Sequence, residues 1–133
     1  MKVVFDTNIL VSAMLWRGTP YRCLLAIRAG LAELILSPPI IDEFRNVLDK
    51  KFALTREEVE EGIALVQESA TLIGIPGTLR VLTDDPEDDK IIETALVAGA
   101  QCLASGDKHL LRLGDYRGIK VISARAFLDM LAE

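Results

Sequence analysis

The sequence has few of the residues that support thiol, zinc or nucleophilic-serine chemistry. Among 133 residues there are two cysteines and one histidine. Cys23 and Cys102 lie in apolar stretches without a second thiol or a histidine at metal-ligand spacing, which indicates core packing. The motifs GxxxxGK[ST] and GxSxG do not occur. Nucleotide hydrolysis of the P-loop type and acyl transfer by a serine nucleophile are therefore excluded.

Long apolar runs are missing as well. No stretch approaches the roughly 20 apolar residues of a membrane helix, and the opening "MKVVFDTN" brings a charge and a polar turn too early for a signal peptide. We therefore expect a soluble, cytoplasmic protein without membrane contact. With 50% hydrophobic residues, the chain can fill a core, and its length predicts one domain over residues 1–133. The net charge of −5 argues against broad non-specific binding to nucleic acid, although it does not exclude a local basic rim.

Short β-branched runs alternate with stretches of helical periodicity along the whole chain. This alternation predicts an α/β protein, with a mostly parallel sheet of about five strands covered by helices on both faces in a three-layer α/β/α sandwich. The predicted strands cover residues 2–5, 32–36, 78–82, 102–105 and 119–122. The predicted helices cover residues 9–15, 20–29, 39–48, 55–73, 88–98 and 124–131. Thr55 and Glu58 have the spacing of a capping box, and Gly74 is expected to end the longest helix.

The strand ends are where a parallel α/β sheet binds its ligands. Asp6 directly follows the first predicted strand, and Glu43 lies in the helix after the second. The third predicted strand leads into the acidic stretch "TDDPEDDK", and Asp107 follows the fourth. Each of these junctions therefore delivers a carboxylate to one edge of the sheet.

Each acid has an ordinary structural explanation that must be weighed. An aspartate at a strand-to-helix turn can cap the helix, but Asn8 could do so alone and leave Asp6 unexplained. Glu43 flanks the apolar stripe of its helix, at the border where a residue can reach into a cleft, while Asp42 points the opposite way. Asp107 could be a simple turn residue. It is improbable that four acids meet at one edge of the sheet for four unrelated structural reasons.

The acidic stretch divides by helical geometry. If Asp85 is the N-cap, Pro86 takes the first helical position, and Asp84, Asp85 and Glu87 are explained by the turn and the helix dipole. Asp88 lies three and four residues before Ile91 and Ile92, on the inward face, whereas Asp89 lies at the edge of that face. Asp88 is therefore the favoured functional acid, with Asp89 as its alternative.

Converging carboxylates repel one another unless a cation or protons neutralise them. Oxygen-only ligands without cysteine or histidine suit Mg²⁺ or Mn²⁺ rather than zinc. Such an ion activates water and stabilises the leaving oxygen at phosphorus, so phosphodiester hydrolysis fits these residues.

The chain resembles a PIN domain, and within that superfamily the toxins of type II toxin–antitoxin modules. The resemblance rests on four segments in the family's order: "VVFDTNILVSA", "SPPIIDEFRNVL", "DDPEDDKIIETALVAGAQCLASGDKHLL" and "IKVISARAFLDML". It implies a Rossmann-like sandwich and a metal-dependent endoribonuclease acting on single-stranded RNA. The acidic quartet of the family maps to Asp6, Glu43, Asp88 and Asp107, with Asn8 and Ser105 as supporting polar neighbours.

The resemblance also implies frequent homodimers and a small antitoxin protein that blocks the cleft. Lys108 and Arg112, near the expected cleft, and Arg17, beside Trp16, are candidates for contacting the RNA. A charged surface turn explains Lys108 and Arg112 equally well.

Two other functions compete with a nuclease. A receiver-like signalling module also uses a parallel sheet, an acidic pocket, Mg²⁺ and a lysine such as Lys108. It requires an acidic pair after the first strand and a phospho-acceptor aspartate ending the third, and the first strand offers only Asp6. The other alternative is a regulatory or binding protein that keeps the PIN scaffold without catalysis.

Overall fold

The computed structural model describes residues 1–81 and 86–133, and within these residues the strands form one sheet in the order β3-β2-β1-β4-β6-β5. The strands are β1 (Lys2–Phe5), β2 (Glu33–Leu36), β3 (Ala70–Leu72), β4 (Cys102–Ala104), β5 (Asp115–Tyr116) and β6 (Ile119–Ile122). The helices are α1 (Thr7–Leu15), α2 (Thr19–Arg28), α3 (Pro38–Lys51), α4 (Arg56–Glu68), α5 (Pro86–Ala98), α6 (Lys108–Leu113) and α7 (Ala124–Leu131). All neighbouring strands pair in parallel except β5, which runs antiparallel to β6.

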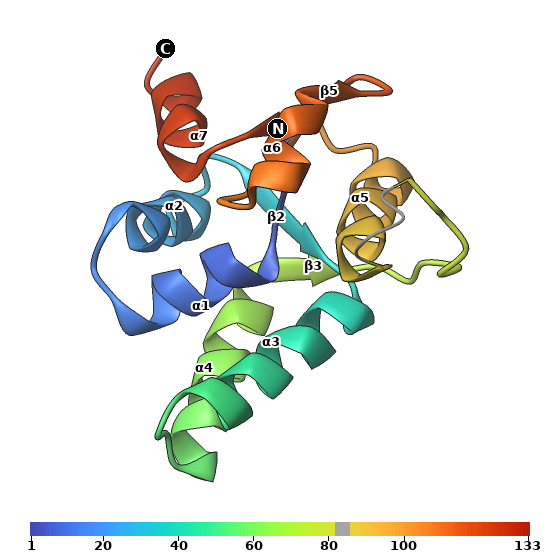
Figure 1. The fold of residues 1–133 in the computed structure, drawn as a ribbon. Coiled ribbons are helices and arrows are strands. Elements are labelled where there is room, and N and C mark those ends of the chain that lie inside the picture. Colours follow the sequence, from blue (N-terminus) through green and yellow to red (C-terminus); the bar gives the residue numbers. More distant parts are fainter. Residues whose placement is uncertain (82–85) are drawn as a thin grey trace.

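Helices cover both faces of this sheet. Helix α5 packs on β1, β2 and β4, while α1, α2 and α7 pack on one another on the opposite side (Figure 1). Helix α3 contacts both α1 and α5 and closes one end of the layers. The predicted α/β/α sandwich with a mostly parallel sheet is therefore confirmed. The antiparallel strand β5 is an addition to the five parallel strands that the sequence predicts.

The central strands are held in place by burial on both faces. Val3, Val4 and Phe5 of β1 are completely buried, and the Phe5 ring meets the ring of Phe127 edge to face at 5.6 Å. Such continuous apolar runs are typical of parallel strands covered by helices. In register, Phe5 lies opposite Ala104 of β4, and the Asp6 N–H donates to the Ala104 carbonyl at 3.0 Å. The residues that follow β1 and β4 are therefore neighbours.

The third strand differs from the prediction. Thr78 to Val81 form no strand, Leu82 lies outside the described residues, and β3 is instead Ala70–Leu72, inside the helix expected over residues 55–73. Helix α4 ends at Glu68 with Ser69 as its C-cap, so the expected end at Gly74 is also wrong. The apolar spacing fits a helix through residue 73, but pairing with the open edge of β2 gives the backbone of residues 70–72 a better set of hydrogen bonds.

Other local features agree with the sequence. Thr55 and Glu58 form the expected reciprocal capping box at the start of α4. Helix α5 begins at Pro86, as expected, whereas the roles predicted for Asp84 and Asp85 lie outside the described residues, as does the side chain of Glu87. Helix α6 and strand β5 were not predicted.

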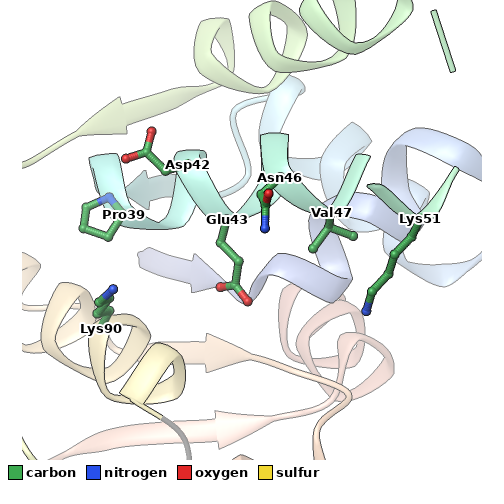
Figure 2. Close-up of a pocket in the computed structure, with 7 residues that line it drawn as sticks. All are labelled: Pro39, Asp42, Glu43, Asn46, Val47, Lys51 and Lys90. Atoms are coloured by element: carbon green, nitrogen blue, oxygen red, sulfur yellow. The ribbon is translucent and has the colours of Figure 1, made fainter. Parts of the chain in front are cut away.

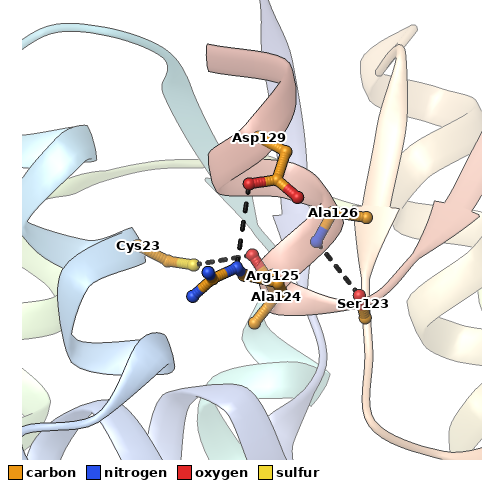
Figure 3. A network of polar contacts seen from close by, with 6 residues as sticks. All are labelled: Cys23, Ser123, Ala124, Arg125, Ala126 and Asp129. Atoms are coloured by element: carbon orange, nitrogen blue, oxygen red, sulfur yellow. Dashed lines mark hydrogen bonds and ion pairs between the residues drawn. The ribbon is translucent and has the colours of Figure 1, made fainter. Parts of the chain in front are cut away.

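Helix α7 is attached to the sandwich at its first turn. The Ser123 hydroxyl accepts the Ala126 N–H at 3.0 Å and caps the helix, and the buried Cys23 thiol of α2 donates to the Ala124 carbonyl at 3.4 Å (Figure 3). The cap fixes the turn from β6 into α7, and the Cys23 contact connects that turn to α2. In the part of the chain that the structure describes, every helix is too short or too polar to cross a membrane.

Candidate active site

A small acidic pocket lies at the carboxyl ends of β1 and β4. Its volume is about 80 Å³, and its lining includes the four acids that the sequence singles out from four separate segments. The lining residues are Asp6, Thr7, Asn8, Glu43, Asp88, Ile91 and Asp107. Residues up to 101 positions apart in the sequence therefore meet at one place. We call this the acidic pocket.

Asp6 is fixed at the base of this pocket by hydrogen bonds to both carboxylate oxygens. Oδ1 accepts the Ile9 N–H at 2.9 Å and caps α1, and Oδ2 accepts the Ser105 hydroxyl. Only 3% of Asp6 is exposed. Asn8, which could have capped the helix alone, does not do so, because Asp6 caps it; Asn8 is exposed and lines the pocket.

The electrostatic setting of Asp6 disfavours its charged form. Burial is the main cause that raises the pKa of its carboxyl above the ordinary value. The hydrogen bonds from Ser105 and Ile9 oppose this effect, and the negative charge of Asp107 adds to it. A carboxylate that is costly to ionise gains most from a cation placed beside it.

Ser105 connects two of the acids. Its hydroxyl donates to Asp6 Oδ2, and its oxygen accepts the Asp107 N–H at 2.9 Å. Asp107 Oδ1 in turn accepts the N–H groups of His109 and Leu110 at 2.7 and 3.2 Å, so this side chain caps α6. Asp6 and Asp107 therefore both act as helix caps and line the pocket. Each carboxylate oxygen has two acceptor positions, so a cap bond leaves capacity for a cation.

Glu43 reaches the pocket from α3. It is half-buried, and its Oε2 accepts the Thr7 hydroxyl at 2.9 Å, a contact between α3 and the first turn of α1. Thr7 itself is buried and lines the pocket. Thr7 is not predictable as a site residue from the sequence, because threonine is common at strand-to-helix turns. Its position between Asp6 and Asn8 is the one signal that could have found it.

Asp88 and Asp89 are separated by what they contact. Both are buried, with 7% and 2% exposed, so burial does not choose between them, and Asp89 is not at the edge of the inward face as predicted. Asp88 lines the acidic pocket. Asp89 does not, and its Oδ1 accepts the Val81 N–H at 2.9 Å, which attaches the segment before residue 82 to α5.

The basic residues expected at the cleft do not line it. Lys108 and Arg112 are exposed on α6, and Arg17 is exposed with its guanidinium 5.5 Å from the Tyr21 ring centroid. None of the three belongs to the lining of the acidic pocket. Basic residues that the sequence analysis missed, Lys51 and Lys90, instead line a larger groove that begins at Glu43.

The pocket fits a hard divalent cation by the chemistry of its donors. Its polar lining consists of carboxylates, a hydroxyl and an amide, which are oxygen donors of the kind that Mg²⁺ and Mn²⁺ take. Asp6, Asp88, Asp107 and Glu43 are the residues that could hold such an ion. Across the side chains of residues 1–81 and 88–133, no three of His, Cys, Asp or Glu are arranged to enclose an ion as they stand.

A Rossmann-like sandwich with carboxylates gathered at the carboxyl ends of its parallel strands defines a class of PIN-like proteins. The chain belongs to the PIN domain family, whose model matches residues 2–109. PIN domains are generally nucleases. No curated protein matches the sequence significantly.

Solved structures share the fold. One is VapBC2 from Rickettsia felis bound to a DNA fragment from its promoter, with a TM-score of 0.65 and 15% identity over 91% of this chain and 97% of that chain. Another is PAE2754 from Pyrobaculum aerophilum, with a TM-score of 0.64 and 17% identity over 99% of this chain and 90% of that chain. At these identities the likeness concerns the fold alone.

Proposed function

We propose that the protein is a single PIN-like domain that acts as a Mg²⁺- or Mn²⁺-dependent endoribonuclease on single-stranded RNA. The observation that carries this proposal is the meeting of Asp6, Glu43, Asp88 and Asp107 in one pocket of a PIN fold. Capping explains Asp6 and Asp107 one at a time, but no single structural role accounts for all four acids at one place. A catalytic site that holds a cation gives them one.

The residues of the pocket divide the work between them. Asp6, Asp88 and Asp107 hold the cation, and Ser105 orients the first and last of these through its two hydrogen bonds. Glu43, positioned by Thr7, completes the ligand set from α3. When bound, the cation activates a water molecule and stabilises the oxygen that leaves phosphorus.

The chain's own groups prepare this site before the substrate arrives. The hydrogen bonds to Asp6 fix its position, and its burial keeps water from screening the charges. Because the acids repel one another, a bound cation would neutralise this repulsion, and activity should depend strongly on the metal. Asn8, exposed at the rim, can donate its amide to a non-bridging phosphate oxygen.

A toxin of a toxin–antitoxin pair is the role that the family and the likeness to VapBC2 support. In this role a small antitoxin protein covers the cleft, and the toxin forms a homodimer. Co-expression with a neighbouring small gene, followed by co-purification, tests the antitoxin; light scattering tests the dimer.

The receiver-like alternative lacks its phospho-acceptor. It needs an aspartate at the end of the third strand, but β3 ends at Leu72 and continues with Ile73 and Gly74. No aspartate at the end of β3 can therefore accept a phosphoryl group. The catalytically silent alternative is separated from the nuclease by a direct assay.

The direct assay is cleavage of a fluorescent single-stranded RNA. We expect cleavage with Mn²⁺ or Mg²⁺, its loss with chelator, and its return when Mn²⁺ is added back. Identically purified Asp6→Asn and Glu43→Gln proteins should be at least about 100-fold slower, because each removes a ligand of the ion. Asp49→Asn, which changes an exposed carboxylate of the same helix as Glu43, is the matched control and should remain active. Equal, chelator-insensitive cleavage by all four proteins would refute the proposal.

A further inference from the structure

A groove of about 740 Å³ extends from the acidic pocket between α3 and α5. Its lining residues are Pro39, Asp42, Glu43, Asn46, Val47, Lys51 and Lys90. Glu43 lines both the groove and the acidic pocket, so the two cavities are neighbours. We call this region the α3 groove.

The side chains of the α3 groove follow the period of the helix. Glu43, Val47 and Lys51 are four residues apart and project to the same side of α3, with Lys90 facing them from α5, while Asp42 projects to the other side (Figure 2). From Pro39 to Lys51 the helix rises about 18 Å at 1.5 Å per residue. The groove is therefore long enough for more than one phosphate of an extended strand.

The two cavities differ in volume, so they can hold ligands of different size. About 80 Å³ holds an ion and a few water molecules, since one water takes roughly 30 Å³ of liquid volume, but it cannot hold a nucleotide. The α3 groove, at about 740 Å³, is within the range of about 300–1,000 Å³ that ligand sites occupy. A strand whose phosphate reaches the acidic pocket must place its adjoining nucleotides outside it.

The α3 groove offers two cations for contacts with a phosphate backbone, beside the two acids Asp42 and Glu43. Lys51 is exposed and Lys90 is half-buried, and they lie toward opposite ends of the groove with Glu43 between them (Figure 2). The chain carries a net charge of −5, and Asp42 and Glu43 balance the two lysines in the groove lining, so the expected phosphate contacts are local to Lys51 and Lys90. Asn46 adds an amide that can both donate to and accept from a base or a 2′-hydroxyl.

We propose that the α3 groove binds the single-stranded RNA segment on one side of the scissile phosphodiester, with Lys51 and Lys90 contacting its phosphates. This inference rests on the proposed ribonuclease function and deepens it, because it assigns the substrate contacts. It moves them from Lys108, Arg112 and Arg17, the candidates named from the sequence, to Lys51 of α3 and Lys90 of α5. Val47 supplies a small apolar surface for the face of a nucleotide.

The test measures binding of a labelled single-stranded oligoribonucleotide by fluorescence anisotropy. The parent is Asp6→Asn in Mg²⁺, which binds without cleaving, and Lys51→Gln and Lys90→Gln are added to it. Each should weaken binding about threefold to tenfold at low salt. Each should also reduce the slope of log K against log salt by about 0.7, the contribution of one phosphate contact to a single strand. Lys50→Gln, the same charge change at the adjacent residue, should leave both values unchanged, and melting curves check that every variant is folded.

Three results would overturn the inference: no binding by the parent, unchanged slopes for Lys51→Gln and Lys90→Gln, or a reduced slope for Lys108→Gln in their place. The same lysine substitutions in the otherwise wild-type chain should raise KM and leave kcat unchanged. If chelator-sensitive cleavage persists with an unchanged KM, the α3 groove inference fails and the proposed function stands. If wild type cleaves no RNA while binding still depends on both lysines, the proposed function fails and the α3 groove stands as an RNA-binding site. Equal binding of a single-stranded DNA would remove the assignment to RNA.

Discussion

Replacing Asp6 by asparagine should stabilise the metal-free protein. Asparagine caps a helix as well as aspartate, so Oδ1 can still accept the Ile9 N–H. The substitution removes a buried charge whose ionisation is disfavoured chiefly by burial and further by Asp107. We expect a gain of about 1 kcal/mol at pH 7 in chelator, within the range common for stabilising substitutions, which raises Tm by about 4 °C.

The pH dependence of this gain has a defined sign. Because the pKa of Asp6 is raised in the folded state, protonation favours folding, and this contribution is complete below the unfolded-state pKa. It is lost as the pH rises through the folded-state pKa. The difference in unfolding free energy between Asp6→Asn and wild type should therefore be smallest in acid and grow toward neutral pH, while other groups cancel in the comparison.

Adding Mn²⁺ should reverse the order of stability. At 100 times Kd, a ligand that binds the folded state alone stabilises it by about 2.7 kcal/mol, and Asp6→Asn should lose most of this. Thermal melts in chelator and in Mn²⁺ measure both effects, with Asp49→Asn as a control that should follow wild type. The reasoning is refuted if the variant is less stable than wild type in chelator at pH 7, or if Mn²⁺ stabilises both proteins equally.

Three further outcomes follow from individual contacts. Asp88→Asn should weaken Mn²⁺ binding at least about tenfold in calorimetry. Asp89→Asn should keep the Mn²⁺ affinity but lower Tm, because it weakens the acceptor of the Val81 N–H. The opposite pattern would exchange the roles of the two residues. Gly62→Ala brings a methyl group to 2.3 Å from the Met14 sulfur, so it should not stabilise the wild-type chain. In the Met14→Ala chain, where this sulfur is gone, Gly62→Ala should raise the free energy of unfolding by about 1 kcal/mol. Equal effects of Gly62→Ala in the two chains would contradict this. Cys23 and Cys102 are buried, and burial raises the pKa of each thiol to about 11. Neither thiol should react with a thiol reagent at pH 8 until the chain unfolds. Rapid labelling of the native protein would argue against the burial of the two cysteines.

The sequence predicts the main arrangement of the candidate site for a physical reason. In a parallel sheet, consecutive strands end at one edge, so an acid directly after a strand is placed there by topology alone. Asp6 and Asp107 illustrate this. Asp88 and Glu43 follow from helical periodicity, because the apolar neighbours of each define the face that turns inward.

The features that the sequence does not predict depend on contacts between distant segments. Ala70 and Ile73 continue the helical period of α4, and pairing with β2 alone makes residues 70–72 a strand. Thr7 carries no periodic signal, and its contact with Glu43 exists because α1 and α3 pack together. Lys51 and Lys90 line one groove because α3 packs against α5. In each case, packing against a segment distant in the sequence decides the conformation or the position of the residue.

A capping role and a catalytic role are not alternatives in this fold. From the sequence, capping is the ordinary explanation of an acid at a strand-to-helix turn, and the acids that no cap explains are the functional candidates. The structure has Asp6 and Asp107 capping α1 and α6 while they line the acidic pocket. The cap bonds fix the carboxylates on the ends of two adjacent strands, which is an advantage for a site that must hold its ligands in place.

A crystal of the protein soaked in Mn²⁺ tests the central claim most directly. The anomalous signal of manganese locates the ion without reference to the surrounding atoms. The account predicts one or two ions in the acidic pocket, with carboxylate oxygens of Asp6, Asp88 and Asp107 at about 2.0–2.2 Å, as expected for a small hard cation. Manganese bound through Asp89, bound at surface acids alone, or missing from the pocket at saturating concentration would contradict it.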